Sequence, residues 1–521
     1  MPTNPSGTTV HRKPNGAAYL YSVKTYWDKG KKAPRNKQVC LGRYNEETGE
    51  VTPTKRRAKK ADAEQPGSDF KATTKVYGPY LLLMKLANDT GLVRMLKKCM
   101  PDIHEALLSL VFFIVQKGLA LSRCEAWSES HQHPSNRSIS SQQVSEILKQ
   151  ITENDRLHFL SLWLEHLLEK ELLCYDLTSI STYATANEYV RWGYNRDKEK
   201  LKQINLAMLY GQKSGMPAYY RRMPGNISDV VTLETTIKAL DFLGKRKLFF
   251  VLDRGFYSED NVDSLLEKRY RFVLMVRNDR VWVRDIIDKY YDQVVSPERY
   301  RQTGEDEVLY MVSHLYQWNG RRCYAHIYYN ATKAAEDVDT LNKKLVICKK
   351  ELETEDLNDA RKSLYERFFI VKRTPKRGLT VSYNEAEIQK YRKRYAGFFC
   401  ILTNVKIDSG DLLELYRRKD VVEKCFDDLK NGLDMKRLRV HSSEAMDTRL
   451  FIQFLALILL SKIRMVLKGD KELQHKSPRE IMESMESVVK ITCSGRYGNI
   501  IAETGPLQQK IIDLFKIDLK T

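Results

Sequence analysis

Three carboxylates stand out for the chemistry that they could do together. Asp176 ends the apolar run LLCYD, Asp253 ends the run LFFVLD, and Glu423 lies far downstream in the basic segment LYRRKDVVEKCFDDLKNG. Apolar runs of this length predict buried strands, and carboxylates at strand ends lie at the rim of an α/β sheet. Two or three convergent carboxylates could bind the two metal ions used in phosphodiester chemistry. Each aspartate alone could instead begin a turn or cap a helix.

The segment around Glu423 has the pattern of an amphipathic helix. At about 100° per residue, four side chains fall on one narrow face, beside an apolar stripe: Tyr416, Lys419, Glu423 and Lys430. The Glu423 carboxylate should therefore emerge at the edge of the buried stripe, where it can point into a cleft. Asp420 and Asp427 lie on almost the same face, so spacing alone favours Glu423 only modestly.

Motifs for other common chemistries are absent from the sequence. There is no phosphate-binding GxxxxGK[ST], no GxGxxG after a strand, no HExxH and no GxSxG. Cys124, His131 and His133 lie close enough in sequence to suggest zinc, but a structural zinc site needs four ligands and no fourth is evident. Nucleoside triphosphates, nicotinamide cofactors and serine hydrolysis therefore have no support.

The charge of the chain favours a polyanionic partner. Lys and Arg number 87 against 67 Asp and Glu, a net charge of +20, and the first 60 residues carry 14 basic against 4 acidic side chains. Nucleic acid is the leading candidate for the partner. Nine cysteines with no C-x-x-C spacing predict reduced thiols in a cytosolic protein. The apolar runs are shorter than the roughly 20 residues that cross a bilayer, so core helices are expected.

Changes of pattern along the chain predict the elements that must position these residues. Strands are expected over residues 17–26, 37–43, 172–177, 204–211, 218–223, 247–253, 271–276 and 397–404. Helices are expected over residues 80–100, 103–121, 156–173 and 229–244, with a capping box at Ser140 and Gln143. Asn319-Gly320 predicts a hairpin turn.

Seven segments follow from this reading. They are a basic N-terminal β-rich DNA-binding unit (1–51), a linker (52–75), a helical domain (76–170), the first part of an α/β core (171–278), a β-rich insertion (279–395), the second part of the core (396–470) and a C-terminal tail (471–521). The linker contains the basic cluster KRRAKK, which could touch DNA or form a solvated charge run.

The sequence resembles the DDE transposases of bacterial insertion sequences, in the insertion-sequence-four group. That group carries Tyr, two residues, Arg, three residues, Glu, six residues and Lys. The same spacing is found here in Tyr416, Lys419, Glu423 and Lys430, with Lys419 where Arg is usual. The stretches DLTS, GYNRDKEKLKQINLAMLYGQKSGMPAYYRRMPGNISD and DRGFYS also resemble this group, and the resemblance covers about residues 75–465.

The resemblance implies a fold and an activity. The α/β core would be RNase H-like, with Asp176, Asp253 and Glu423 as ligands of two Mg²⁺ ions, which Mn²⁺ could replace. The protein would cut double-stranded DNA at the terminal inverted repeats of an element and transfer the freed 3′-OH to target DNA. It would act as a homodimer in the DNA complex, in the bacterial cytoplasm near the nucleoid, with no membrane and no nucleotide cofactor.

The resemblance also implies contacts with DNA. Tyr416, Lys419 and Lys430 would hold the phosphates at the cleaved end. Arg254 would neutralise a phosphate or pair with a surface acid, and Trp318 would stack on a flipped base or pack against a neighbouring strand. A hydrolytic nuclease of the same fold and a domesticated, non-catalytic DNA-binding protein are the alternatives.

Overall fold

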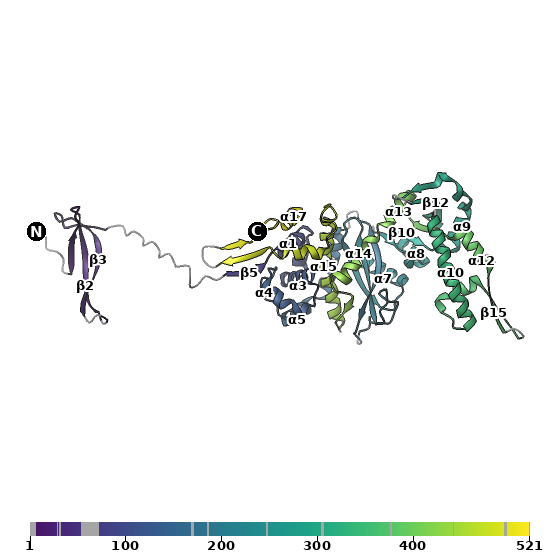
Figure 1. The fold of residues 1–521 in the computed structure, drawn as a ribbon, viewed down its shortest axis with the longest axis horizontal. Coiled ribbons are helices and arrows are strands. Elements are labelled where there is room, and N and C mark those ends of the chain that lie inside the picture. Colours follow the sequence, from purple (N-terminus) through teal and green to yellow (C-terminus); the bar gives the residue numbers. More distant parts are fainter. Residues whose placement is uncertain are drawn as a thin grey trace. The chain divides into compact units, whose positions relative to one another are not determined.

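The computed structural model describes most of the chain: residues 7–28, 30, 33–53, 72–167, 171–184, 187–245, 248–303, 307–375, 378–440, 442–493 and 498–519. The chain divides into two compact units (Figure 1). The smaller is Met1–Ala72 with Cys493–Gly498, and the larger is Thr73–Thr492 with Asn499–Thr521.

The smaller unit is an antiparallel sheet of four strands in sequential order: β1 (Thr8–Arg12), β2 (Ala18–Asp28), β3 (Ala33–Tyr44) and β4 (Val51–Thr52). The strands expected over residues 17–26 and 37–43 are confirmed as β2 and β3. Only Ala18, Leu20 and Tyr44 form its buried cluster, so most of the sheet is exposed to solvent. The basic cluster KRRAKK lies outside the described residues.

Among the described residues, six α-helices precede the core sheet: α1 (Gly78–Asp89), α2 (Leu92–Cys99), α3 (His104–Lys117), α4 (Cys124–Ser130), α5 (Ser141–Gln150) and α6 (Glu153–Leu167). The helical pattern is confirmed, as is the capping box of Ser140 and Gln143 at the start of α5. The single helix expected over residues 80–100 is two helices. Gly91 has a φ of 74°, a left-handed conformation that ends one helix and begins the next.

The core sheet contains ten strands and runs through the larger unit (Figure 1). Its first elements are β6 (Leu173–Thr182), β7 (Gln203–Gly211), β8 (Pro217–Pro224), α7 (Asp229–Phe242), β9 (Phe249–Leu252), α8 (Glu259–Glu267) and β10 (Arg271–Val276). β7 and β8 pair antiparallel beside β6, whereas β9 and β10 continue the sheet in parallel on the other side. Every residue of β7 is buried, as its apolar run predicts for a strand covered on both faces.

Helices cover both faces of this sheet. On one face the Tyr175 hydroxyl bonds Thr236 of α7. On the other face the Tyr210 hydroxyl donates to Ser461 of α15 (Ser443–Leu467). Within the described residues α15 is long and apolar enough to cross a membrane, but 78% of its apolar window is buried inside the protein, as in a core helix.

The insertion is not β-rich. It contains α9 (Val281–Tyr290), β11 (Tyr300–Gln302), β12 (Val308–Trp318), β13 (Arg321–Tyr329), α10 (Ala331–Thr354), α11 (Lys362–Phe368), β14 (Phe369–Thr374), β15 (Gly378–Tyr383) and α12 (Glu385–Lys390). The Asn319-Gly320 hairpin is confirmed, with positive φ at both residues. Helices nevertheless predominate, because α10 buries a stripe at helical spacing: Leu341, Leu345, Cys348 and Leu352.

The hairpin of the insertion belongs to the core sheet. β13 pairs antiparallel with β16 (Phe398–Thr403), which pairs with β10. β11, β12 and β13 of the insertion therefore extend the sheet that carries β6 and β9, whereas β14 and β15 form a separate two-stranded sheet.

The C-terminal segment is folded. It forms α16 (Pro478–Met485), β18 (Val489–Cys493), β19 (Asn499–Ile501) and α17 (Pro506–Phe515). β18 lies between β19 and β5 (Ala72–Val76) in a three-stranded sheet. Residues from near both ends of the larger unit thus meet in one sheet.

A core substitution should show how far stability depends on α15. Phe451 is fully buried, and its ring packs edge-on against Phe159 with centroids 5.4 Å apart. Phe451→Ala should lower the free energy of unfolding by about 3–5 kcal/mol, measured by denaturant titration. Phe242→Ala is the matched control, because that ring is 86% exposed and its loss should change stability by less than about 0.5 kcal/mol. Equal effects of the two changes would contradict this packing.

Candidate active site

Asp176 and Asp253 lie side by side on neighbouring parallel strands. β6 pairs with β9 so that Tyr175 is opposite Leu252, and the next residue on each strand is an aspartate. Neighbouring strands are about 4.8 Å apart, so the two carboxyl groups share one small region. Asp253 directly follows β9, as expected.

Asp176 does not end a strand, and that expectation is wrong. β6 continues to Thr182, pairing with β7 as far as Ser181. The apolar run ends at Asp176 because the following strand residues include buried hydroxyl side chains, not because the strand ends.

The environment of Asp176 favours its protonated form. Burial raises the pKa of this carboxyl to about 6, and the charge of Asp253 adds to the effect. The Leu177 amide, which donates to Asp176 Oδ1 at 2.7 Å, and the cations of Lys419 and Arg196 oppose the rise without cancelling it.

Asp253 lies in a more polar environment. Burial by itself raises its pKa, but the Lys419 ammonium and three hydrogen bonds outweigh burial and hold the pKa below its usual value. The Tyr416 hydroxyl and the Arg254 amide donate to Asp253 Oδ1 at 2.8 and 2.7 Å, and Lys419 Nζ is 3.3 Å from Oδ2. The two neighbouring carboxyl groups therefore have pKa values shifted in opposite directions, a pattern common at catalytic sites.

The long helix expected around Glu423 is three shorter segments. They are α13 (Ser409–Arg417), α14 (Asp420–Asp427) and a π-helical turn, η7 (Asp428–Gly432). Between α13 and α14 the Lys419 amide bonds the Tyr416 carbonyl only three residues back, and a π turn contains an extra residue. Both irregularities rotate the helix away from a uniform 100° per residue.

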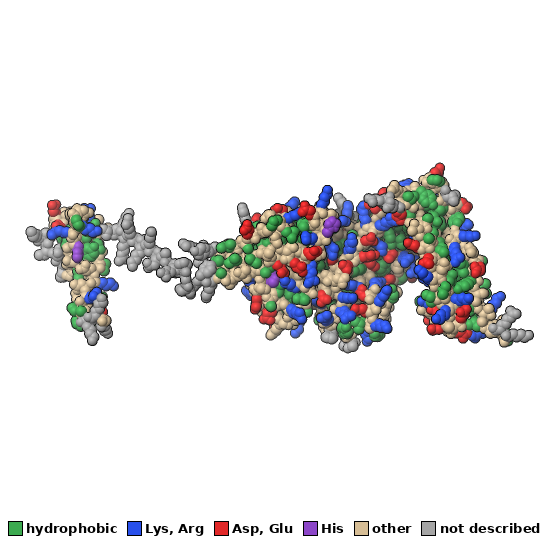
Figure 2. Space-filling view, viewed as in Figure 1, with side chains coloured by type: hydrophobic (Ala, Val, Ile, Leu, Met, Phe, Trp, Pro, Cys, Tyr) green, Lys and Arg blue, Asp and Glu red, His purple; other side chains and the backbone are tan. Residues whose placement is uncertain are grey.

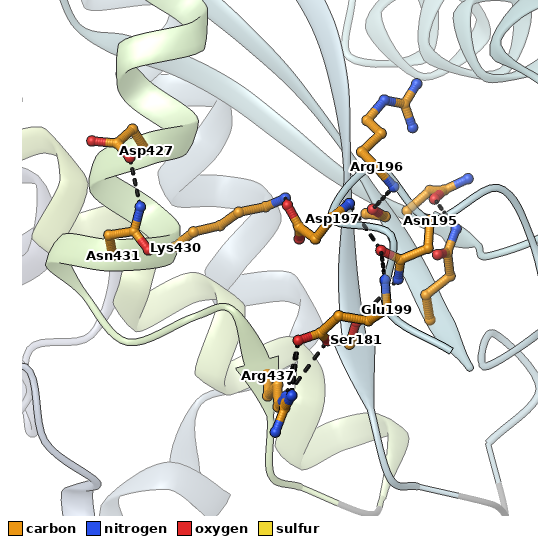
Figure 3. Close-up of polar contacts among 12 residues, drawn as sticks. Ser181, Asn195, Arg196, Asp197, Glu199, Asp427, Lys430, Asn431 and Arg437 are labelled. Carbon is orange, nitrogen blue, oxygen red and sulfur yellow. Dashed lines mark hydrogen bonds and ion pairs between the residues drawn. The ribbon is translucent and has the colours of Figure 1, made fainter. Parts of the chain in front are cut away.

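Three of the four side chains of the expected face have charged partners, and these partners differ. Tyr416 and Lys419 contact Asp253. Lys430 instead binds Asp197, with its Nζ 2.8 and 2.6 Å from the two carboxylate oxygens (Figure 3). Tyr416 and Lys419 thus share one partner, whereas Lys430 has another.

Glu423 lies on α14 with its side chain exposed to solvent. This helix packs against the sheet next to Asp176, because Cys425 Sγ is 3.2 Å from the sulfur of Met208, which is opposite Asp176 in the β6–β7 pairing. Among the described residues, however, no three His, Cys, Asp or Glu side chains are close enough to hold a metal ion. The structure thus brings two of the three expected carboxylates together, with Glu423 on a neighbouring helix.

The rival acids on α14 are placed differently from each other. Both are exposed, and Asp427 also accepts a hydrogen bond from Asn431 at 2.6 Å (Figure 3). In the described part of the chain, neither Asp420 nor Asp427 contacts Asp176 or Asp253.

Arg254 and Trp318 have opposite surroundings. The Arg254 side chain is exposed, forms no ion pair within the described residues, and lies near enough to Tyr416 to oppose the rise in its pKa. Trp318 is buried, and its Nε1 donates to Asp263 at 2.8 Å while its ring packs edge-on against Trp282. In this conformation the Trp318 ring is packed against protein and is not open to a base.

The histidines near Cys124 are structural. Both ring nitrogens of His133 have protein partners, the Ser109 hydroxyl at 3.0 Å and the Ser128 carbonyl at 3.1 Å. His131 Nδ1 lies 3.1 Å from the Trp127 carbonyl. This arrangement offers no zinc site within the described residues.

The connection between β6 and β7 also contributes charged groups to the site, which the sequence reading did not identify. Arg196 binds Asp229 at 3.0 Å and lowers the pKa of Asp176. Asp197 binds Lys430, and Glu199 binds Arg437 at 2.9 Å (Figure 3). No residue spacing reveals such contacts, because the partners are more than 30 residues apart; the basic character of the connection was the only signal.

Comparisons with known proteins agree with the geometry on the family. The model of the family described as "Transposase DDE domain" matches residues 168–459, more than half of the chain. A search of curated proteins finds no match to the chain.

Among solved structures, one match is the cryo-EM structure of a piggyBac transposase synaptic complex with hairpin DNA. Its sequence is 12% identical, the alignment covers 80% of this chain and 82% of that one, and the TM-score is 0.38. The family model, whose match includes Asp176, Asp253 and Glu423, gives the identification. The chain belongs to the transposase DDE domain family, a membership that implies an RNase H-like core.

Proposed function

We propose that this protein is a DNA transposase that cleaves the ends of a mobile element and transfers the freed 3′-hydroxyl to DNA. The observation that carries the proposal is the pair Asp176 and Asp253, side by side on parallel strands within the residues matched by the family. The strand order β8-β7-β6-β9-β10 supports an RNase H-like core. The spacing of Tyr416, Lys419 and Glu423 supports the insertion-sequence-four group.

The aspartate pair fits a divalent cation such as Mg²⁺, with Mn²⁺ as a substitute. Both side chains offer the oxygen donors that Mg²⁺ takes, and Asp176 lacks enough positive charge nearby to keep its pKa low. We assign Asp176 and Asp253 as ligands, and Glu423 as the third carboxylate that would join them. When bound, metal ions in such sites activate water and stabilise the attacking and leaving oxygens.

The residues around Asp253 are suited to hold DNA phosphates. Tyr416 and Lys419 contact this carboxylate, and the exposed Arg254 lies beside them. Lys419 replaces the family's usual arginine and supplies a point charge without the two-pronged geometry of a guanidinium. The Lys430 ammonium, paired with Asp197 here, would exchange this partner for a phosphate.

The DNA partner fits the distribution of charge. Figure 2 shows Lys and Arg side chains over much of the visible face of the larger unit, interspersed with Asp and Glu. The exposed β2–β3 hairpin of the smaller unit adds Lys24, Arg35 and Lys37. We assign that unit to binding of the terminal repeats, and we infer a homodimer in the DNA complex because two ends must be paired.

The three carboxylates should be essential for cleavage but not for DNA binding. Asp176→Asn, Asp253→Asn and Glu423→Gln should each lower the rate of cleavage of end-containing DNA in Mg²⁺ by at least about 100-fold, because each removes a negative metal ligand. Gel-based cleavage and a binding assay measure the two properties separately.

Matched controls lie on the same helix. Asp420→Asn and Asp427→Asn should leave cleavage within a few-fold of the original protein. Full activity in Glu423→Gln with loss in either control would transfer the role to the rival acid. Inactivity of the unchanged protein that nonetheless binds element ends would favour the non-catalytic alternative.

Asp176 should make stability depend on pH. Its pKa is raised in the folded protein, so the folded state binds the proton more tightly than the unfolded state, and the free energy of unfolding should fall as pH rises from about 4 to about 6. Asp176→Asn should therefore be the more stable protein at pH 7, by on the order of 2 kcal/mol, and similar at pH 4. Thermal unfolding at several pH values, with and without Mn²⁺, checks this; stabilisation by Mn²⁺ should be weaker in the variant. A variant less stable at pH 7 would contradict the assignment.

Lys430→Ala should weaken handling of the DNA end while sparing metal binding. Removal of the ammonium leaves Asp197 without its partner and adds repulsion toward phosphate, so strand transfer should slow by about 10-fold or more. Strand-transfer rates at saturating Mn²⁺ are the measurement. Lys238→Ala, an exposed lysine on α7, is the control, and an unchanged rate in Lys430→Ala would remove Lys430 from the site.

A further inference from the structure

The connection between β6 and β7 displays two aromatic rings to solvent. Trp192 is 62% exposed and Tyr194 is 83% exposed. Large rings on a protein surface mark binding sites when other features converge on them. No described part of the chain buries either ring, so packing within the protein does not account for these two aromatic side chains.

The backbone that carries these rings is firmly held. Arg191 exchanges two backbone hydrogen bonds with Gln203, of 3.0 and 2.9 Å, and Gln203 Nε2 donates to the Tyr194 carbonyl at 3.0 Å. Gly193 lies so close to Gly225 that an added Cβ would be 1.9 Å from its carbonyl oxygen. The backbone of residues 191–194, which we call the platform, is therefore already ordered. Little backbone conformational entropy would be lost when the two rings bind a partner.

The charge around the rings is positive. The same connection contains exposed Arg191, Lys198 and Lys200, which form no ion pairs within the described residues. The connection also contains three acids: Asp197 and Glu199 are paired with Lys430 and Arg437 (Figure 3), and Glu188 is exposed without an ion pair in the described part of the chain. The cations without an ion pair still outnumber that one acid. Exposed aromatic rings flanked by unpaired cations are the combination with which proteins bind unpaired nucleotides.

The platform is continuous with the candidate active site. Arg196, two residues after Tyr194, donates its amide to the Ser179 hydroxyl at 2.9 Å, and Ser179 is three residues after Asp176 on β6. The next residue, Asp197, binds Lys430 of η7. Tyr194 is two residues from Arg196 and Trp192 is four, so extended chain separates them from Arg196 by at most about 7 Å and about 14 Å. A strand whose phosphate lies at the aspartate pair would therefore reach Tyr194 and Trp192 with nucleotides a few positions away.

We propose that Trp192 and Tyr194 stack on unpaired DNA bases next to the phosphate being processed, with Arg191, Lys198 and Lys200 along the backbone of that strand. The inference rests on the proposed function and adds to it the residues that bind the opened end. It assigns base stacking to exposed rings, whereas Trp318 is buried against Trp282.

The test uses the full chain and two DNA probes. One is a fully paired duplex, and the other is the same duplex with a short single-stranded tail containing 2-aminopurine, whose fluorescence is quenched by stacking. Trp192→Ala and Tyr194→Ala should each weaken binding of the tailed probe by about 10-fold and reduce the quenching, with little change for the paired duplex. Trp192→Phe and Tyr194→Phe should retain most of both. Phe242→Ala, which removes another highly exposed ring, is the control and should change neither.

Three results would contradict the proposal that Trp192 and Tyr194 stack on unpaired bases. Unchanged quenching and affinity in both alanine variants would show that the rings do not touch bases. An equal loss for tailed and paired DNA would indicate backbone contact without stacking. A change in oligomeric state with unchanged DNA binding would assign the rings to a second copy of the chain. If the unchanged protein bound neither probe, the transposase proposal itself would fail, which distinguishes that failure from loss of the platform alone.

Discussion

The parallel pairing of β6 with β9 is the constraint on which the site depends. It places Asp176 beside Asp253 although 76 residues separate them in the sequence. Parallel neighbours need a crossover connection, and β7, β8 and α7 supply it. The β7–β8 pair and α7 therefore lie between the two aspartates in the sequence because they form this crossover.

The two neighbouring carboxylates are partly buried and repel each other. The residues around them offset that repulsion for one carboxylate more than for the other. Lys419 and Tyr416 contact Asp253 directly, whereas the charges of Lys419 and Arg196 only partly offset the rise in the pKa of Asp176. A site with this imbalance gains most from a divalent cation, since one ion compensates both negative charges.

The helix is interrupted before and after α14, and side chains from this short stretch of chain contact two different acids, Asp253 and Asp197. A tight turn at Lys419 directs its ammonium to Asp253, and the π turn after Asp427 directs Lys430 to the β6–β7 connection. α15 packs against this stretch, because Arg464 of α15 pairs with the buried Asp428 of η7. The same connection that binds Lys430 displays Trp192 and Tyr194, so these residues, which we propose to contact DNA, share one support.

The sequence by itself determined where most strands of the core lie, and it indicated three candidate carboxylates. Apolar runs identify β7, β9 and β10, and Asn319-Gly320 identifies its hairpin, because periodicity and turn chemistry are local properties. Only the tertiary structure decided that Asp176 lies within a strand, that α13 and α14 are separate, that Trp318 is buried, and that Lys430 pairs with Asp197. These outcomes depend on strand pairing and on contacts between residues far apart in sequence, which no local pattern contains.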